Sequence, residues 1–500
     1  MKRTQQIVLG PPGTGKTTFL LNEVATRLAG GIPARRIAYV SFTRKAAHEA
    51  VERALLRFGG SKAEFPYFST LHSLAFRELG LSKERVMGAQ HYKRIGEALG
   101  LQFSDYMDFE EGVPVGQKDG DRVLYCASIA RARLVSLREQ WHTNNDGTNW
   151  FQLEQFAATL KRYKEDTGMM DFTDMLDDYL ECDPLPIDVA FIDEAQDLSR
   201  QQWRMVRHAV SKAKEVFIAG DDDQAIYRWS GADVESFLQL QGERRVLDRS
   251  YRLPRSVFAL CNRISSRIGR RFPKQWQPRE EDGRVTTING IHNLEFGSGS
   301  YLILARNKYL LKDLEDHVRR AGVPYTTGRS SSVKKDSIQA ILDWEQLRRG
   351  EPLLGSRIKA VYQFLNVGTG VQRGFKSLSM LHDEDTVTMA VLVEAYGLLR
   401  TDIWHEALEK MPVLEREFYV AAKRRNEKLT VAPRVHISTI HGVKGGEADH
   451  VVLLPDLAWR TYNEYVDAPD DEHRVFYVAA SRARHNLMLL SPTGNKFYPV

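Results

Sequence analysis

Short apolar runs alternate along the chain with longer amphipathic stretches, and most runs end in glycine, serine or an acidic residue. The runs lie at residues 7–9, 37–40, 189–192, 216–219, 301–304, 435–437, 451–454 and 487–490. Short buried strands that alternate with helices are typical of parallel sheets covered on both faces. Because the runs fall into two groups, before and after about residue 248, the pattern predicts an α/β protein with two sheet-containing lobes.

Two long stretches lack strand signals, and each predicts a mainly helical subdomain inserted into a lobe, because structureless loops of that length are rare in compact domains. The clearest helical patterns in them cover residues 128–139, 151–163, 336–349 and 401–414. The predicted domains are therefore a first lobe (1–79 and 166–248) with an insertion (80–165), and a second lobe (249–329 and 432–500) with an insertion (330–431).

Composition places the chain among ordinary globular proteins. Its 500 residues are 42% hydrophobic and 27% charged, with a formal net charge of +5, which fits several folded domains and excludes a polycation. The three cysteines, Cys126, Cys182 and Cys261, are far apart, so neither a disulfide framework nor a cysteine-bound metal is expected. Without a secretory leader or a bilayer-spanning run, the sequence predicts a soluble cytoplasmic protein, without membrane association.

The first apolar run leads into a complete phosphate-binding pattern, G-x-x-x-x-G-K-[ST], followed by a helix. Its residues are Gly10, Pro11, Pro12, Gly13, Thr14, Gly15, Lys16 and Thr17, with Thr18 next. In such a loop, backbone N–H groups surround the phosphates of a nucleotide, the lysine reaches the β- and γ-phosphates, and the hydroxyl suits Mg²⁺. The loop predicts binding of a nucleotide with Mg²⁺, but it does not distinguish kinases, GTPases, AAA+ machines and helicases.

A pair of carboxylates follows the apolar run at 189–192. Hydrolysis of a phosphoanhydride needs one carboxylate for the metal ion and a second one that orients or deprotonates water. Asp193 is predicted to bind Mg²⁺ together with Thr17, and Glu194 to act on the water.

A polar and aromatic segment follows the run at 216–219. Gln224 could sense the γ-phosphate, whereas Tyr227 and Trp229 are aromatic side chains of the kind on which unpaired bases stack. A single aromatic residue beside a strand is more often part of the core. A phosphate sensor and aromatic residues in one short segment nevertheless favour a link between a nucleotide and a nucleic acid.

The order of these motifs resembles that of the UvrD/Rep/PcrA type of superfamily 1 helicases over nearly the full chain. The matching segments are 10–17, 41–47, 69–75, 171–176, 193–197, 224–229, 250–252, 305–307, 322–325, 439–447 and 476–483. The resemblance implies two RecA-like lobes with a nucleotide between them, and an ATP-dependent DNA helicase or translocase.

The resemblance also implies roles for single residues on the nucleotide side. Tyr251 is expected to stack on the adenine and Glu447 to contact the ribose, whereas Arg252 and Arg482 are expected to reach the γ-phosphate from the second lobe. Together with Lys16, Asp193, Glu194 and Gln224, the two arginines complete the expected catalytic set.

On the DNA side, the resemblance implies a single-stranded path across both lobes. The expected contacts are Phe42, Thr43, His72, Tyr227, Trp229, His441 and Lys444. It further implies 3′→5′ movement and binding to junctions of single- and double-stranded DNA, and we expect a monomer. The pathway (repair, replication or recombination) is left open.

A basic stretch supports contact with a DNA backbone independently of any family. No aspartate or glutamate occurs from Arg249 to Arg279, whereas Lys274 and several arginines do, and some of the arginines recur at helical spacing. Four of them, Arg263, Arg267, Arg270 and Arg271, are predicted to share one face of a helix. Such a stripe could neutralise phosphates, and a merely solvated basic helix is an equally good interpretation for any one arginine.

Three features depart from the family pattern. No glutamine that would contact adenine precedes the phosphate loop, Ser230 stands where relatives usually carry arginine, and the second insertion is short. Two other functions remain open: an AAA+-type remodelling ATPase, and a DNA- or partner-binding regulator that uses ATP only as a switch. A helicase–nuclease is less favoured, because no nuclease-sized segment follows the last motif.

Overall fold

The computed structural model describes residues 3–42, 44–104, 108–110, 113–115, 118–144, 146–328 and 330–500. The chain forms two compact units: Met1–Gly283 with Asn463–Ser481, and Arg284–Tyr462 with Arg482–Val500. The units therefore divide after Gly283, whereas the predicted lobes divide at residue 248. Segment 249–283 belongs to the first unit because its side chains bind residues around the first sheet, as described below.

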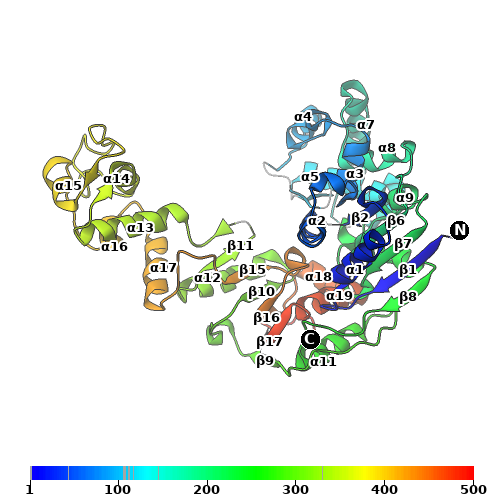
Figure 1. Cartoon of the computed structure of the whole chain (residues 1–500). Helices are drawn as coiled ribbons and strands as arrows, with labels where there is room; N and C mark the ends of the chain where they lie inside the picture. Colours follow the sequence, from blue (N-terminus) through cyan, green and yellow to red (C-terminus); the bar gives the residue numbers. More distant parts are fainter. Residues whose placement is uncertain are drawn as a thin grey trace. The chain divides into compact units, whose positions relative to one another are not determined.

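The first unit is built on a six-stranded sheet in the order β3-β2-β6-β7-β1-β8 (Figure 1). Its strands, all parallel to their neighbours, are β1 (Thr4–Leu9), β2 (Ile37–Ser41), β3 (Phe68–Thr70), β6 (Val189–Asp193), β7 (Glu215–Gly220) and β8 (Glu243–Val246). Helices α1 (Lys16–Ala29) and α2 (Arg44–Phe58) pack on the sheet, where Leu20, Val24 and Ala50 join its apolar core. Parallel strands place their carboxyl ends at one edge, which is where ligands bind in such sheets.

Further helices of the first unit surround this sheet. They are α3 (Leu71–Glu78), α8 (Phe172–Asp178), α9 (Arg200–Ala209), α10 (Val234–Leu238), α11 (Arg255–Ser265) and α19 (Pro469–Ala480). Helix α19 comes from the end of the chain and packs against α11.

The first insertion has its own apolar core, which includes Tyr92, Phe103 and Phe156. Its elements are α4 (Ala89–Leu99), the hairpin of β4 (Asp108–Glu110) and β5 (Val113–Val115), α5 (Asp119–Arg133), α6 (Leu137–Thr143) and α7 (Trp150–Thr167). The helix predicted over 151–163 is confirmed by α7. The helix predicted over 128–139 is wrong, because Leu134 has a φ of 55° and ends α5 in the left-handed conformation.

The second unit contains a seven-stranded sheet in the order β12-β11-β15-β10-β16-β17-β9. Its strands are β9 (Arg284–Ile288), β10 (Tyr301–Ala305), β11 (Tyr325–Thr327), β12 (Ser330–Ser331), β15 (Val435–Thr439), β16 (Ala448–Leu454) and β17 (Ala483–Leu490). All pairs are parallel except β11 with β12, and α12 (Lys312–Arg320) packs on the sheet. All eight apolar runs are strands, so the predicted α/β class with two parallel-sheet lobes is confirmed.

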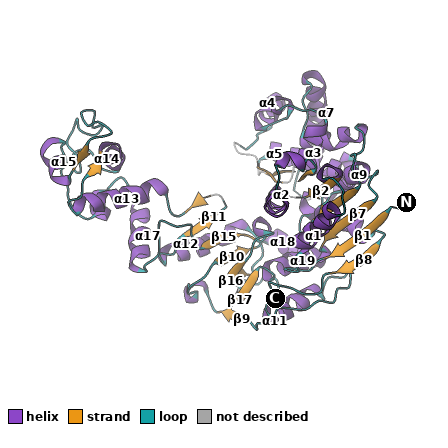
Figure 2. Cartoon of the chain, in the orientation of Figure 1, coloured by secondary structure: helices purple, strands orange, loops and turns teal. Residues whose placement is uncertain are grey.

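The second insertion is mainly helical (Figure 2). It has a separate apolar core that includes Trp344, Tyr362 and Leu392. Its elements are α13 (Lys335–Arg348), β13 (Leu353–Leu354), α14 (Gly355–Tyr362), β14 (Thr386–Val387), α15 (Met389–Ala395), α16 (Trp404–Ala407) and α17 (Val413–Arg424). The helix predicted over 336–349 is confirmed by α13. The one predicted over 401–414 is wrong, because Pro412 stands at the N-cap of α17 and separates it from the short α16.

The last helix before α19 is α18 (Trp459–Asp467), which contains the boundary between the units. Within the described parts of the chain, we find no helix with the length and apolar character that crossing a membrane requires.

Candidate functional site

The phosphate loop connects β1 to α1 at the carboxyl edge of the first sheet. Gly13 and Gly15 have φ values of 73° and 79°, which residues with a side chain rarely adopt. Gly15 is the N-cap of α1, and within the described residues no side chain caps this helix start. The first turn of α1 therefore presents backbone N–H groups and the positive end of the helix dipole, both of which can bind an anion such as a phosphate.

Lys16 is held across this loop. Its Nζ donates to the Gly10 carbonyl oxygen at 2.9 Å and lies 3.6 Å from Glu194 Oε1, and its side chain is 11% exposed. A Cβ at residue 10 would overlap the Lys16 side chain, so glycine is required there. The ammonium group is thus fixed close to both the loop and the carboxylate that follows β6.

Asp193 ends β6 and is 2% exposed. Its Oδ2 accepts hydrogen bonds from Thr17 Oγ1 at 3.1 Å and from the Tyr39 hydroxyl at 2.6 Å, and its Oδ1 accepts one from the Glu194 N–H at 2.9 Å. Burial and the negative charge of Glu194 raise the pKa of Asp193, whereas the Tyr39 hydrogen bond and the charge of Lys16 oppose that rise.

A hydroxyl and a carboxylate side by side are a donor set that fits Mg²⁺, which prefers oxygen ligands and few protein groups. Among the described residues, no three or more His, Cys, Asp or Glu side chains gather as a metal site. Thr17 and Asp193 therefore fit the predicted ion as two of its ligands, and Tyr39 is a further partner of Asp193 that the sequence patterns did not indicate.

Glu194 adopts a φ of 54°, a conformation that is strained for a residue with a side chain. Its Oε2 accepts a hydrogen bond from Gln196 Nε2 at 2.6 Å, and Gln196 Oε1 accepts one from the Asp221 N–H at 3.0 Å. Asp221 Oδ2 in turn accepts one from Gln224 Nε2 at 2.7 Å. The two predicted residues Glu194 and Gln224 are thus joined through Gln196 and Asp221.

The structure brings Tyr251 and Arg252 to the phosphate loop within the first unit, although both were assigned to the second lobe from the sequence. The Tyr251 N–H donates to the Gly13 carbonyl oxygen at 2.8 Å, and Ser250 Oγ donates to the Pro12 carbonyl oxygen at 2.8 Å. A Cβ at residue 13 would overlap the Arg252 side chain. The Tyr251 side chain is 72% exposed, as stacking on a base would require.

The other predicted nucleotide contacts, Glu447 and Arg482, lie together in the second unit. Arg482 is 2% exposed and donates from Nη1 to the Gly446 carbonyl oxygen at 3.3 Å, and its own carbonyl oxygen accepts from the Ala448 N–H. Glu447 forms an ion pair with Arg484. His441 and Lys444 are half-buried; His441 begins one turn of 3₁₀ helix that follows β15, and Lys444 comes directly after that turn.

The aromatic residues predicted to face DNA form one cluster at the carboxyl edge of the first sheet. The rings of Phe42 and Tyr227 are 5.5 Å apart, and those of Tyr227 and Trp229 are 6.3 Å apart. Phe42 and Tyr227 are only 7% and 9% exposed, whereas Trp229 is half-buried. His72 packs edge-on against Phe172, and Thr43 lies outside the described residues.

Helix α5 of the first insertion supports the loop that carries Trp229. The Tyr125 hydroxyl donates to the Trp229 carbonyl oxygen at 2.6 Å, and Arg133 donates to the Arg228 carbonyl oxygen at 3.1 Å. Ser230 Oγ donates to the Tyr227 carbonyl oxygen at 2.8 Å, so the serine that replaces the usual arginine closes the turn.

The basic stretch is not a helical stripe. Helix α11 ends at Ser265, so Arg267, Arg270 and Arg271 lie beyond it and the predicted common face is wrong. Several of its cations instead pair with carboxylates of the same unit, at 3.3 Å or less. These pairs are Arg249–Glu280, Arg255–Asp282, Arg270–Glu235, Arg271–Asp223 and Lys274–Asp221.

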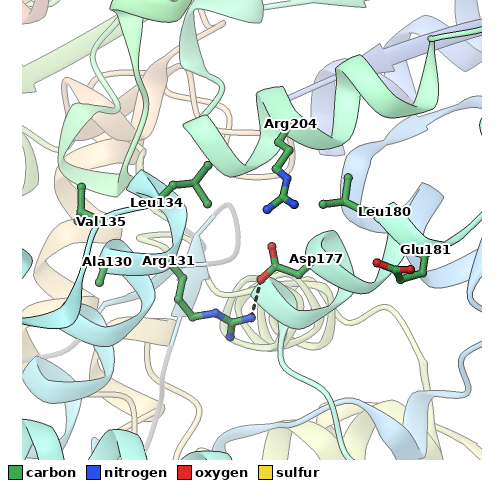
Figure 3. A pocket seen from close by; sticks show the side chains of 8 residues that line it. All are labelled: Ala130, Arg131, Leu134, Val135, Asp177, Leu180, Glu181 and Arg204. Carbon is green, nitrogen blue, oxygen red and sulfur yellow. Dashed lines mark hydrogen bonds and ion pairs between the residues drawn. The ribbon is translucent and has the colours of Figure 1, made fainter.

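Two cavities of the first unit lie next to the carboxyl end of α5, away from the phosphate loop. One, of about 350 Å³, is lined by Arg131, Leu134, Asp177, Leu180 and Arg204 among others, and Arg131 donates to Asp177 there at 3.0 Å (Figure 3). The other, of about 600 Å³, shares Arg131 and is lined largely by apolar side chains between α5 and α7. Neither cavity contains a residue predicted for the nucleotide or the DNA.

Comparisons with known proteins identify the family of the chain. Residues 2–244 match the UvrD/REP helicase N-terminal domain, and residues 407–492 match the UvrD-like helicase C-terminal domain. The chain is 23% identical over 378 residues to the ATP-dependent DNA helicase PcrA of Bacillus subtilis, which covers 68% of this chain and 51% of that protein. It is 24% identical over 376 residues to PcrA of Staphylococcus aureus, with the same shares.

The chain therefore belongs to the UvrD-like helicase family, and the predicted membership is confirmed. It spans about half the length of the curated relatives it matches.

Proposed function

We propose that the protein is an ATP-dependent DNA helicase or translocase that uses Mg²⁺ and moves on single-stranded DNA. The observation that carries this proposal is the segment from Asp221 to Trp229. One end of the segment is hydrogen-bonded, through Gln196, to Glu194, and the other end holds the aromatic cluster. A change at a bound nucleotide can thus reach the aromatic side chains within one short loop.

For ATP hydrolysis, the loop glycines and the start of α1 bind the phosphates, and Lys16 neutralises charge on the β- and γ-phosphates. Thr17 and Asp193 would hold Mg²⁺, which neutralises phosphate charge when bound. Glu194 orients the attacking water and accepts its proton, Gln224 senses the γ-phosphate, and Tyr251 stacks on the base. We propose that Thr18, Arg252, Glu447 and Arg482 contribute the further nucleotide contacts that the resemblance implies.

For DNA, Trp229 is the member of the aromatic cluster whose exposure best suits stacking on an unpaired base, and Phe42 and Tyr227 fix its position. His72, Thr43, His441 and Lys444 are further proposed contacts. Movement in the 3′→5′ direction, preference for junctions and action as a monomer rest on the family resemblance, and the names of the PcrA relatives support DNA as the substrate.

The proposal is tested with partial duplexes that carry a 3′ or a 5′ single-stranded tail. We expect single-stranded DNA to stimulate ATP hydrolysis, and ATP with Mg²⁺ to separate the 3′-tailed duplex faster than the 5′-tailed one. Nucleotide-dependent DNA binding without translocation or unwinding would instead indicate an ATP-switched regulator. Hexamers without DNA stimulation would indicate an AAA+-type remodelling ATPase, and either result would overturn the proposal.

Replacing Trp229 by alanine should weaken single-stranded DNA binding about fivefold to a hundredfold, because stacking contributes roughly 1–3 kcal/mol per base. The KM for ATP without DNA should stay unchanged, since Trp229 stands at the far end of the segment from Asp221, the residue linked to the proposed catalytic groups. Fluorescence anisotropy with labelled oligonucleotides and steady-state ATPase assays measure the two effects. Phe151→Ala, which truncates an exposed aromatic side chain on α7, is the matched control. Equal loss of DNA and ATP binding in Trp229→Ala would contradict this division of roles.

A further inference from the structure

Three consecutive carboxylates after β7 surround a single buried ammonium group. Lys274 Nζ lies 2.7 Å from Asp221 Oδ1, 2.6 Å from Asp222 Oδ1 and 2.9 Å from Asp223 Oδ2, and all four side chains are fully buried. Charges in such a place are tolerated only when they are paired and hydrogen-bonded. Lys274 therefore cannot serve as one of the solvent-facing cations that the basic stretch suggested.

Other groups fix the same carboxylates from two separate parts of the chain. Arg271 donates two hydrogen bonds to Asp223 at 2.8 and 2.6 Å, and the Phe272 N–H donates to Asp222 Oδ2 at 2.8 Å. Arg474 of α19, itself 3% exposed, donates to the Asp222 carbonyl oxygen at 2.9 Å. Segment 271–274 and α19 are thus both attached to the loop that begins after β7.

Asp221 connects this cluster to the proposed catalytic groups. One of its carboxylate oxygens binds Lys274, and the other accepts the Gln224 amide at 2.7 Å. Its backbone N–H donates to Gln196, whose amide donates to Glu194. Both the residue proposed to sense the γ-phosphate and the residue proposed to act on the water are therefore oriented by way of Asp221.

We propose that Lys274 is a positioning residue for ATP hydrolysis, which fixes Asp221 and thereby the orientation of Gln224. This inference rests on the proposed function. Without the ammonium group, Asp221 Oδ1 would keep only the long hydrogen bond from the Asp223 N–H, at 3.3 Å, while the carboxylate lay beside two others. Repulsion between these charges would turn it away from its present orientation. The Gln224 amide would then lose its fixed acceptor, and small displacements of this kind cost catalytic rate without preventing substrate binding.

The alternative is that Lys274 contributes only to folding, and a charge-balanced variant separates the two roles. Lys274→Met alone would leave three buried carboxylates with one cation fewer and would destabilise the first unit. Lys274→Met with Asp222→Asn removes one charge of each sign, so the thermal midpoint should recover. The contact between Lys274 and Asp221 remains absent in this double variant, so its kcat for DNA-stimulated ATP hydrolysis should remain about tenfold below wild type, with the KM for ATP changed by less than about twofold.

A double-mutant cycle with Gln224→Ala shows whether Lys274 acts through Gln224. In the Gln224→Ala background, the Lys274→Met/Asp222→Asn change should alter kcat by less than about twofold, because the group it positions is already missing. Arg36→Met is the control, because it removes a two-bond ion pair with Asp188 beside the amino end of β2, and it should lower the thermal midpoint without changing kcat.

Three results would each overturn the inference and leave Lys274 only a role in folding. These are full recovery of kcat in the charge-balanced variant, additive effects in the cycle, and a charge-balanced variant that does not fold. Absence of DNA-stimulated ATP hydrolysis in the wild-type protein would overturn the proposed function instead. The failure of the inference and the failure of the proposed function are therefore distinguishable.

Discussion

Replacing Glu194 by glutamine should lower the kcat of DNA-stimulated ATP hydrolysis by about two to four orders of magnitude, the usual contribution of a general base. Glutamine has nearly the same shape and can still accept the hydrogen bond from Gln196, but it cannot take a proton from water. ATP binding should persist or become tighter, because one negative charge near the phosphates disappears while Lys16 keeps its bond to Gly10. Steady-state ATPase assays and equilibrium nucleotide titration measure the two quantities.

The matched control is Glu181→Gln, which removes the same charge from an exposed position of the first unit. It should leave hydrolysis unchanged. If Glu194→Gln hydrolysed ATP at the wild-type rate, Glu194 would not be the base, and the assignment of the carboxylate pair would be wrong.

Replacing Lys16 by methionine should both weaken ATP binding and lower hydrolysis by about a hundredfold or more, because a fixed positive charge at the transferred phosphate is lost from a sheltered site. Methionine retains the apolar stem that packs against Gly10, so the loop itself should keep its shape. Arginine should not restore activity, since the Lys16 stem occupies the space where Gly10 lacks a side chain and leaves little room for a larger head group.

Lys212→Met is the control for Lys16→Met, because Lys212 is an exposed lysine of the same unit. Circular dichroism of Lys16→Met, Lys16→Arg and Lys212→Met tests whether these variants fold. Binding of a fluorescent ATP analogue tests the phosphate site. Unchanged binding and hydrolysis in Lys16→Met would place the phosphates elsewhere.

The central strands could be predicted from the sequence because they are buried on both faces and their apolar residues follow one another without interruption. Edge strands carry no such run. β8 contains Glu243, Arg244 and Arg245 and pairs with β1 alone, whereas β9, at the end of the second sheet, is largely exposed. Their side chains resemble those of loops, and only the pairing partner makes them strands.

Regular apolar spacing predicts the helices. It does not predict a helix end that lies inside a regular apolar pattern, where only the backbone conformation changes. Leu134 interrupts a continuous apolar pattern through its φ of 55°, for which leucine gives no signal. Pro412 did carry a signal, since proline rarely continues a helix beyond its first turn, yet the helix predicted over 401–414 ran through it.

The candidate nucleotide site could be predicted because a phosphate loop needs fixed residue types at fixed spacing. Partners distant in the sequence could not: Tyr39 lies in a buried strand without any polar pattern, and Lys274 looked like one cation of a basic stretch. Their roles depend on which carboxylates the fold places beside them, and this is a property of the three-dimensional contacts. Gln196 lies close to the carboxylate pair in the sequence, yet only the structure shows that its side chain connects Glu194 to Asp221.

The hydrogen bonds from Tyr125 and Arg133 to the Trp229 loop limit how far the protein can be shortened. A version without residues 80–165 would still contain every strand of the first sheet and the whole phosphate loop. It would, however, leave the Arg228 and Trp229 carbonyl oxygens without these donors and remove the α5 side chains that pack beside Gly231. Such a minimal protein would keep its phosphate loop but would lose two of the hydrogen bonds that hold its aromatic loop. The inserted helices are therefore a structural requirement of the aromatic loop.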